Sequence, residues 1–388
     1  MIRFLLLCII TLSVLPGCEK SLPPGTGGTT GTPSPSPPPP PNPPPVPSPP
    51  PGSDTINPFP NGTLVGNLSV PRSNMASAVC RNKLFFAGGW NGQGIVNNVD
   101  IFDLSTNATS SAQLSMARAD ITGVSSSSKV FFAGGFTVAG WKHPSSRVDI
   151  YNAETGQWEV AELSIARSHM AAGVAGNKVF FAGGITDYPM TTSRVDIYDL
   201  VTRTWSTAEL SEARGDFTAV VTGDKILFAG GRTHTGTGAS STVDIYDLIT
   251  GTWNTATLHG PKISLHSGAL NGKAYITGST FGPGTPAVDV FDAPANTWST
   301  LQLTESKAWI PVGIYNNKTG FIGGMLSWFN YSRKMEIYDP VTHTWQYQNL
   351  RHDLMWQSLI SYNNFIYSAG GSINGDEQYL SGIIRFQL

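Results

Sequence analysis

The sequence predicts an all-β fold, because one strand pattern recurs along the chain at a nearly constant step. A short hydrophobic strand such as VFFAGG, from Val179, ends in paired glycines. The paired slot begins at Gly88, Gly134, Gly183, Gly230, Gly278, Gly323 and Gly370, in steps of 45 to 49 residues. Self-similarity at this period is typical of four-stranded units arranged as a β-propeller, here with seven blades.

Within one repeat, residues 167–205, four strands follow one another. ARSHMAAGVAG carries the small residues expected of an inner strand near the central axis, and NKVFFAGG is the second strand. RVDIYDL alternates apolar and polar side chains as the third strand. A short turn then leads to a fourth strand that opens with Trp205. Each unit is therefore expected to be an antiparallel sheet of four strands.

Aromatic residues mark the third and fourth strands at a strict spacing. A tryptophan stands seven residues after a tyrosine or phenylalanine in five units, at Tyr151 and Trp158, Tyr198 and Trp205, Tyr246 and Trp253, Phe291 and Trp298, and Tyr338 and Trp345. Because the slot is repeated, we expect these rings to fill the space between blades rather than to bind a ligand.

The glycine pair after a hydrophobic strand, followed by Tyr and by Trp seven residues later, resembles the kelch repeat. The resemblance covers residues 62–388 and implies a propeller of seven four-stranded antiparallel blades. Three departures are local: the fifth unit has Gly278 and Ser279 as its pair, Thr109 stands in the first Trp slot, and the seventh unit lacks a basic residue in register.

The last unit ends after its third strand, at Leu388. The segment TLVGNLSVPR before the first unit has the spacing of a fourth strand, since Thr63 lies nine residues before Arg72. We therefore expect this N-terminal strand to complete the seventh blade and close the ring, which removes an open sheet edge.

The N-terminus predicts export and a membrane anchor. Arg3 precedes an apolar run, and Leu15-Pro16-Gly17 stands before Cys18, an ending that resembles a bacterial lipobox. Residues 1–17 are thus expected to be a lipoprotein signal peptide, with a lipid on Cys18. An ordinary signal peptide is the alternative. We expect residues 18–58 to form a disordered Pro/Ser/Gly-rich tether and residues 59–388 to form the propeller. The predicted location is the cell envelope, periplasmic or cell-surface.

Composition excludes some partners. Only 13% of residues are charged and the net charge is −2, so the chain has no basic field for a nucleic acid. Of the three cysteines, Cys8 leaves with the signal and Cys18 is the predicted lipid site, so Cys80 is expected to be a buried hydrophobe. We expect a monomer.

Two sets of residues are predicted to share one face of the propeller. The first set lies two residues after a repeated slot that is basic in six units, and differs from unit to unit: Asn74, Asp120, His169, Asp216, Ser264, Trp309 and Trp356. The second set lies on the loops after the glycines and includes Trp90, Trp141 and Trp328. Aromatic side chains mixed with Asp, Asn and His suit a surface that stacks on sugar rings or anchors a protein. The alternative is that these aromatics only cover one another.

A repeated set of bases faces a repeated set of acids. Arg72, Arg118, Arg167, Arg214, Lys262 and Lys307 stand at one height, with Asp100, Asp149, Asp196, Asp244, Asp289 and Glu336 at the start of the third strands. One acid for each base favours structural ion pairs over a site for an anionic ligand.

The preferred hypothesis is a lipid-anchored recognition module outside the cytoplasm that binds a protein or a glycan with its loop-rich face. The alternative is a carbohydrate-active enzyme, since the kelch resemblance includes a copper-radical sugar oxidase and a sialic-acid mutarotase. The seven histidines form no ligand pair at short spacing and no nucleophile motif is present, so we expect no cofactor and no metal. A mutarotase or epimerase is the stronger enzymatic hypothesis.

Overall fold

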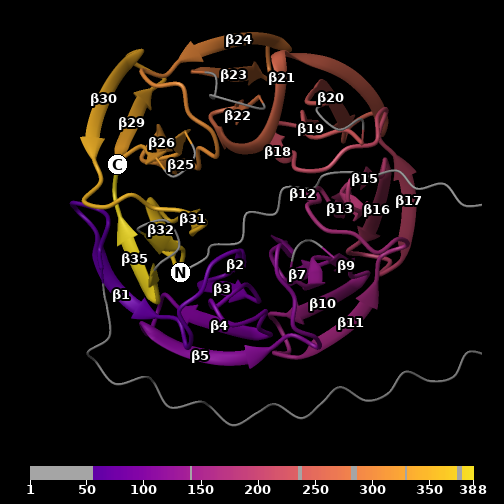
Figure 1. Cartoon of the computed structure of the whole chain (residues 1–388). Helices are drawn as coiled ribbons and strands as arrows, with labels where there is room; N and C mark the ends of the chain where they lie inside the picture. The colour runs from indigo at the N-terminus through magenta and orange to yellow at the C-terminus, as the bar shows by residue number, and fades with distance from the viewer. Residues whose placement is uncertain (1–55, 140–141, 235–237, 281–285, 328–329, 374–377) are drawn as a thin grey trace, which may run out of the picture. The chain divides into compact units, whose positions relative to one another are not determined.

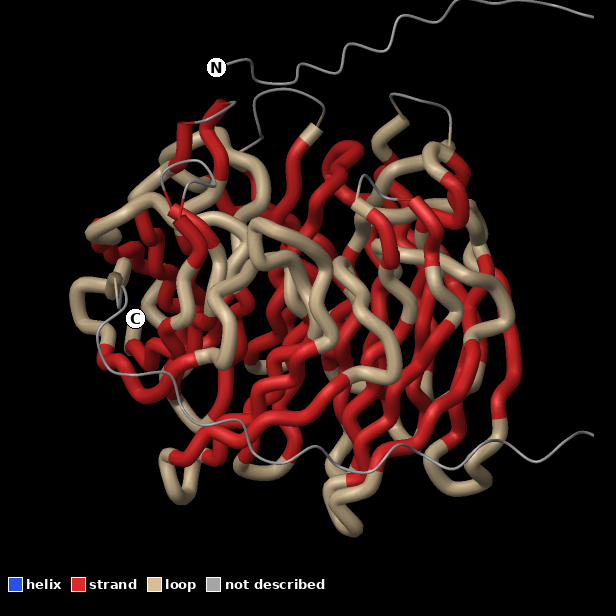
Figure 2. The backbone as a smooth tube through the Cα atoms, turned by 60° about the horizontal axis from the view of Figure 1, so that its bottom comes forward, coloured by secondary structure: helices blue, strands red, loops and turns tan. Residues whose placement is uncertain are grey.

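The computed structural model describes residues 56–139, 142–234, 238–280, 286–327, 330–373 and 378–388. These ranges consist of strands, turns and loops without a helix, as Figure 2 shows, so no helix among them could cross a membrane. The prediction of an all-β fold built from antiparallel four-stranded sheets is confirmed.

The sheets follow one another around a ring, with their first strands toward its centre and their last strands on its rim (Figure 1). The first sheet contains β2 (Ala76–Cys80), β3 (Lys83–Ala87), β4 (Asn98–Asp103) and β5 (Ala108–Gln113). The next contains β6 (Thr122–Ser125), β7 (Lys129–Ala133), β10 (Arg147–Asn152) and β11 (Trp158–Glu162). A third contains β12 (Ala171–Ala175), β13 (Lys178–Ala182), β16 (Arg194–Asp199) and β17 (Trp205–Glu209).

One strand belongs to two neighbouring groups of four. β21 (Thr252–Leu270) pairs with β20 (Ser240–Asp247) through its first part and with β22 (Lys273–Ser279) through its last part. The resulting seven-stranded sheet also contains β18 (Thr218–Thr222), β19 (Lys225–Ala229), β23 (Ala287–Asp292) and β24 (Thr297–Gln302). Elsewhere the chain leaves a sheet through a loop before it enters the next sheet, and the sequence did not predict this continuous crossing.

The last two sheets bring the chain back to its first strand. One contains β25 (Val312–Tyr315), β26 (Lys318–Ile322), β29 (Lys334–Asp339) and β30 (Thr344–Asn349). The other contains β31 (Ser358–Tyr362), β32 (Phe365–Ala369), β35 (Gly382–Phe386) and β1 (Thr63–Asn67). β1 pairs antiparallel with β35, with Thr63 opposite Arg385 and Asn67 opposite Gly382.

Contacts of the N-terminal segment begin before β1. Phe59 stacks on Phe386, with ring centroids 3.8 Å apart, and the backbone N–H of Arg351 donates to the carbonyl of Pro58. Ile56 packs against the same hydrophobic cluster. These contacts start three residues before the predicted domain boundary at residue 59, so the folded part takes in the end of the predicted tether.

Aromatic rings fill the space between sheets, as the repeated slot predicts. Tyr151 lies opposite Trp158 on the neighbouring strand, with centroids 5.2 Å apart, and also contacts Phe85 of the preceding sheet at 5.1 Å. Tyr198 repeats the pattern with Trp205 at 5.1 Å and Phe131 at 5.4 Å. Such ring pairs add favourable contacts beyond the area that they bury.

Short hairpins follow the glycine pairs in four of the units. They are β8 (Phe136–Val138) with β9 (Lys142–Pro144), β14 (Ile185–Asp187) with β15 (Met190–Thr191), β27 (Met325–Ser327) with β28 (Asn330–Tyr331), and β33 (Ser372–Ile373) with β34 (Gln378–Tyr379). Because second strands end where first strands begin, these hairpins rise from the face that the sequence predicts to carry function.

Candidate functional site

The seven variable positions share an unusual backbone conformation. All have a positive φ, between 47° and 54°, at Asn74, Asp120, His169, Asp216, Ser264, Trp309 and Trp356. This left-handed region suits Asn and Asp better than other non-glycine residues, and a bulky side chain there is an outlier. Every repeat therefore turns its chain sharply just before the inner strand, whatever side chain the position carries.

The glycine pair makes this turn possible. In the third repeat, Ser168 and Ile185 form a β-bridge beside His169. Gly184, with φ of 115°, lies between these segments, and a Cβ at this position would come within 2.7 Å of the carbonyl oxygen of Ser168. Glycine is required because the two backbones approach so closely.

Backbone hydrogen bonds join these positions from one repeat to the next. The N–H of Asp120 donates to the carbonyl of Asn74 at 3.3 Å, and that of Asp216 donates to His169 at 3.1 Å. Ser264 in turn donates to the carbonyl of Asp216 at 3.1 Å. The residues that these bonds join therefore lie directly beside one another, as their common height in the sequence predicts.

A charged cluster lies at the second, third and fourth of these positions. The Nε2 atom of His169 is 3.6 Å from Oδ2 of Asp120 and 3.8 Å from Oδ1 of Asp216. Arg232 donates from Nε to Oδ2 of Asp216 at 3.2 Å. Enclosure by protein atoms raises the pKa of Asp120, the negative charge of Asp216 adds to the rise, and His169 opposes it.

Arg232 was missed by sequence reasoning. It is the first residue after Gly230 and Gly231, a slot that Trp90 and Phe136 hold in the first two repeats. Arg232 also forms a β-bridge with Gly215, directly before Asp216. The register of the repeat could have revealed this side chain, because the slot is fixed relative to the glycine pair.

A pocket of about 80 Å³ lies at the sixth and seventh positions. Trp309 and Trp356 both line it, although they come from adjacent repeats. The remaining lining residues are His266, Pro311, Gly324, Met325, Tyr331, Leu354, Met355 and Gln357. His266 is an exposed residue of β21, and its imidazole is one of the polar groups of the lining. The pocket can hold several water molecules or a small ligand group.

Comparison with known protein families identifies the repeat in three segments of the chain. The Kelch motif matches residues 71–108, 166–209 and 213–257. The described residues fold as a β-propeller, and these three matches support a propeller of kelch repeats. A solved structure titled "Structure of YjhT" aligns with a TM-score of 0.56 and 15% sequence identity, covering 76% of this chain and all of that chain. At this identity, the likeness concerns the fold. No curated protein matches the chain.

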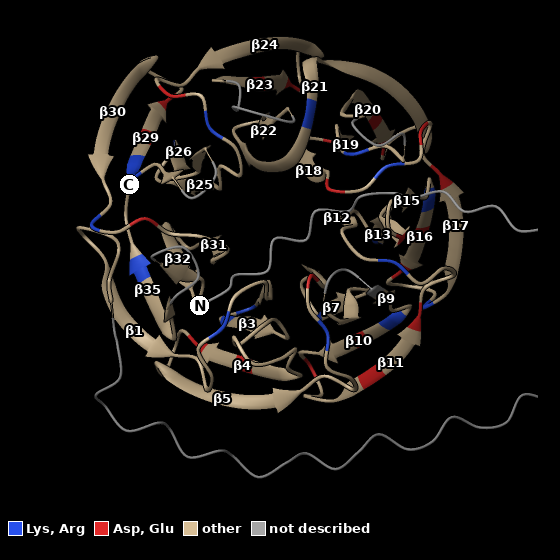
Figure 3. Ribbon diagram, viewed as in Figure 1, with Lys and Arg blue, Asp and Glu red and all other residues tan. Residues whose placement is uncertain are grey.

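The six basic residues of the repeated slot are buried in ion pairs rather than aimed at a ligand. Arg72 is 2.7 Å from Asp100, Arg167 is 2.6 Å from Asp196, and Lys307 and Glu336 pair at 3.0 Å. Three further pairs join Arg118 to Asp149, Arg214 to Asp244, and Lys262 to Asp289. Figure 3 shows basic and acidic segments around the whole ring rather than gathered in one sector.

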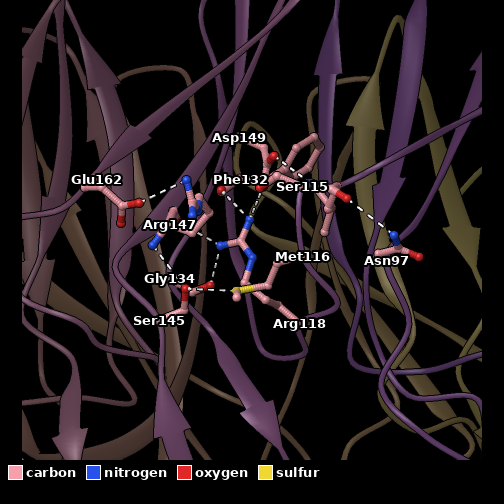
Figure 4. A network of polar contacts seen from close by, with 11 residues as sticks. Asn97, Ser115, Met116, Arg118, Phe132, Gly134, Ser145, Arg147, Asp149 and Glu162 are labelled. Atoms are coloured by element: carbon pink, nitrogen blue, oxygen red, sulfur yellow. Dashed lines mark hydrogen bonds and ion pairs between the residues drawn. The ribbon is translucent and has the colours of Figure 1, made fainter. Parts of the chain in front are cut away.

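Each acid also joins two neighbouring sheets. In Figure 4, the guanidinium of Arg118 points at Asp149 and at the backbone carbonyls of Phe132 and Gly134. The other oxygen of Asp149 accepts the N–H of Ser115, which lies just after β5 of the preceding sheet, at 2.8 Å. The ion pairs therefore belong to the scaffold.

The other predicted residues contribute less to the described site. Trp90 is half-buried and bridges Ser73 and Ile95 through its backbone. Trp141, Trp328 and Cys18 lie outside the described residues. Within the described ranges, no group of three or more His, Cys, Asp and Glu side chains is arranged to hold a metal ion. Cys80 is buried, and its thiol donates to the carbonyl of Ser126.

Proposed function

We propose that this kelch propeller is a recognition module that binds a protein or a glycan with the face described above. The observation that carries the proposal is the shared pocket of Trp309 and Trp356. Both tryptophans occupy the variable position of the repeat, so the scaffold does not require them. Ligand sites are typically concave and mostly apolar, with a few polar groups that fix orientation.

The proposal includes the location of the module. A lipid on Cys18 would hold the propeller on a membrane outside the cytoplasm, and the proline-rich segment would act as a spacer. A ligand reached in this way belongs to the envelope or to the surroundings of the cell. Neither the leaflet nor the identity of the ligand is part of the proposal.

A glycan array and a pull-down from envelope extract test the binding proposal together. Wild-type protein is expected to retain at least one glycan or one protein, and Trp309→Ala and Trp356→Ala are expected to weaken that binding about thirtyfold. A ligand that both variants bind as the wild type does would place the site elsewhere.

A second candidate is isomerisation of a sugar, as in a mutarotase or epimerase acting on an acidic sugar. The charged cluster favours it, because Asp120 has a raised pKa and lies beside the imidazole of His169. A carboxyl and an imidazole in contact are suited to proton transfer. Following anomer exchange of sialic acid by NMR with wild type and Asp120→Asn separates the candidates. If the wild type accelerates anomer exchange and Asp120→Asn does not, the protein is an isomerase rather than a recognition module.

A further inference from the structure

The two tryptophans of the pocket are held against the preference of their backbone. Trp309 has φ of 47° and Trp356 has φ of 48°, a conformation that is unfavourable for a bulky residue. Asn74 occupies the same position in the first repeat, and its short polar side chain tolerates this conformation. Trp356 is also 42% exposed, so a large part of its indole is open to a ligand.

The described side chains that line the pocket include no carboxylate, ammonium or guanidinium group. None of its ten described lining residues is Asp, Glu, Lys or Arg, and His266 is the one lining residue that can take up a proton near neutral pH. A charged ligand group would lose its water here without gaining a counter-ion. A wholly apolar group would in turn leave the amide of Gln357 and the imidazole of His266 without ligand partners.

We infer that the pocket between Trp309 and Trp356 is a subsite for an uncharged sugar ring. A pyranose presents C–H groups on its face, which suit the indoles, and hydroxyls around its edge, which suit His266, Tyr331 and Gln357. A single aromatic side chain of a protein ligand would offer at most one hydroxyl to these three groups. This inference rests on the proposed recognition function and names the ligand class for that site.

The pocket lies near the charged cluster on the same face. Ser264, two residues before His266 on β21, donates its N–H to the carbonyl of Asp216. The pocket and the charged cluster of Asp120, His169 and Asp216 are therefore separated by one short stretch of inner strand.

The test uses the full chain in detergent and a panel of sugars. The neutral probes are methyl pyranosides of glucose, galactose, mannose and N-acetylglucosamine, and the charged probes are sialic acid, glucuronic acid and glucosamine. Binding is followed by tryptophan fluorescence and by saturation-transfer NMR. At least one neutral probe should bind the wild type and should bind Trp356→Asn about thirtyfold more weakly or not detectably.

Trp356→Asn also tests whether the left-handed backbone at position 356 is unfavourable for tryptophan. Trp356→Asn should melt at the wild-type temperature or a few degrees above it, because Asn tolerates the left-handed backbone. Trp345→Phe, in the slot between sheets, is the control for loss of an indole, and it should bind the neutral probe as the wild type does. Melting of Trp356→Asn well below the wild type would overturn the claim that the tryptophan is held for binding.

The remaining outcomes separate this inference from the proposed function. Binding of charged probes only, or binding that Trp356→Asn leaves unchanged, overturns the neutral subsite and leaves recognition standing. A protein ligand captured without any sugar binding has the same meaning. If neither a sugar nor an envelope protein binds, both proposals are wrong.

Discussion

Leu354 and Ile384 lie in one buried hydrophobic cluster of the last sheet, at the positions that Arg72 and Asp100 hold in the first sheet. Ile384 pairs with Ser368 across the strands just as Asp100 pairs with Phe86. The same scaffold thus accepts either a buried ion pair or two aliphatic side chains. In the last sheet, Phe59 from the N-terminal segment belongs to this cluster too.

This exchange predicts how the ion pairs respond to mutation. Asp149→Ala should destabilise the protein by about 3–5 kcal/mol, because it leaves the guanidinium of Arg118 buried without its acid. The double variant Arg118→Leu/Asp149→Ile should recover part of that loss. Recovery should be incomplete, because Arg118 also donates to the carbonyl of Phe132 and Asp149 accepts from Ser115. Urea unfolding of Arg118→Leu, of Asp149→Ile and of the double variant measures the coupling free energy between the two positions. Losses that simply add would contradict it.

Asp120 should make stability depend on pH in a defined direction. Because folding raises its pKa, its carboxyl stabilises the fold below about pH 4, and this contribution is lost as the pH rises through the folded pKa. Asp120→Asn keeps a residue that tolerates the left-handed backbone. The variant should therefore melt above the wild type at pH 7, and the difference should vanish toward pH 3. Thermal melts between pH 3 and pH 8 test this.

Asp247 provides a control of opposite sign. Its carboxylate accepts from Lys225 and from the backbone N–H groups of Thr250 and Ile249, which lowers its pKa to about 2. Its contribution to stability is present above about pH 4 and is lost as the pH falls toward 2. Asp247→Asn should melt below the wild type at pH 7 and alike at pH 2. A common direction for both variants would show that the pH effect does not come from these groups.

Closure of the last sheet gives a truncation test. Removing residues 1–55 should leave the melting temperature nearly unchanged, because the described contacts begin at Ile56. Removing residues 1–70 should lower it strongly, since it takes away Phe59 and β1 and exposes the edge of β35. Calorimetry of the two truncated proteins gives the comparison. Equal melting temperatures would mean that β1 contributes little to the fold.

The anchor is tested at Cys18. If this cysteine carries a lipid, wild-type protein should partition into the detergent phase, and Cys18→Ser should stay unprocessed or be released from membranes. Mass spectrometry of the mature N-terminus should find Cys18 as the first residue, with the mass of acyl chains. Recovery of wild-type protein wholly from the aqueous phase would rule the lipid out.

Much of the fold was predictable because the repeat places glycines and aromatic residues at fixed positions, and each of these residue types suits few backbone conformations or environments. The glycine pairs place the end of each second strand, and the spacing of Tyr198 to Trp205 places the hairpin that follows. The pairing of β1 with β35 followed from the spacing of Thr63 to Arg72. The continuous β21 did not, because the chain that crosses between sheets at residues 258–262 carries no signal distinct from a loop.

The site was predictable in part. Fixed register led to Trp309 and Trp356, and both line the pocket. His266 and Gln357 were not predicted as lining residues. They lie just after the variable position of their repeats, where the repeat pattern predicts an inner strand. The left-handed φ at Trp309 could not be expected from a residue type that avoids it. The left-handed backbone of these tryptophans therefore indicates the site more clearly than the amino-acid composition of the face does.

The continuous strand β21 determines where the chain can be divided. Two fragments cut between β11 and β12 would divide only the last sheet, because β1 stays with the first fragment and pairs with β35 of the second when the fragments meet. A cut inside residues 252–270 would divide the last sheet as well, and would also separate one strand that is hydrogen-bonded to both β20 and β22. Such fragments would each carry an unfinished sheet edge. Complementation by co-expressed halves should accordingly succeed at the first position and fail at the second.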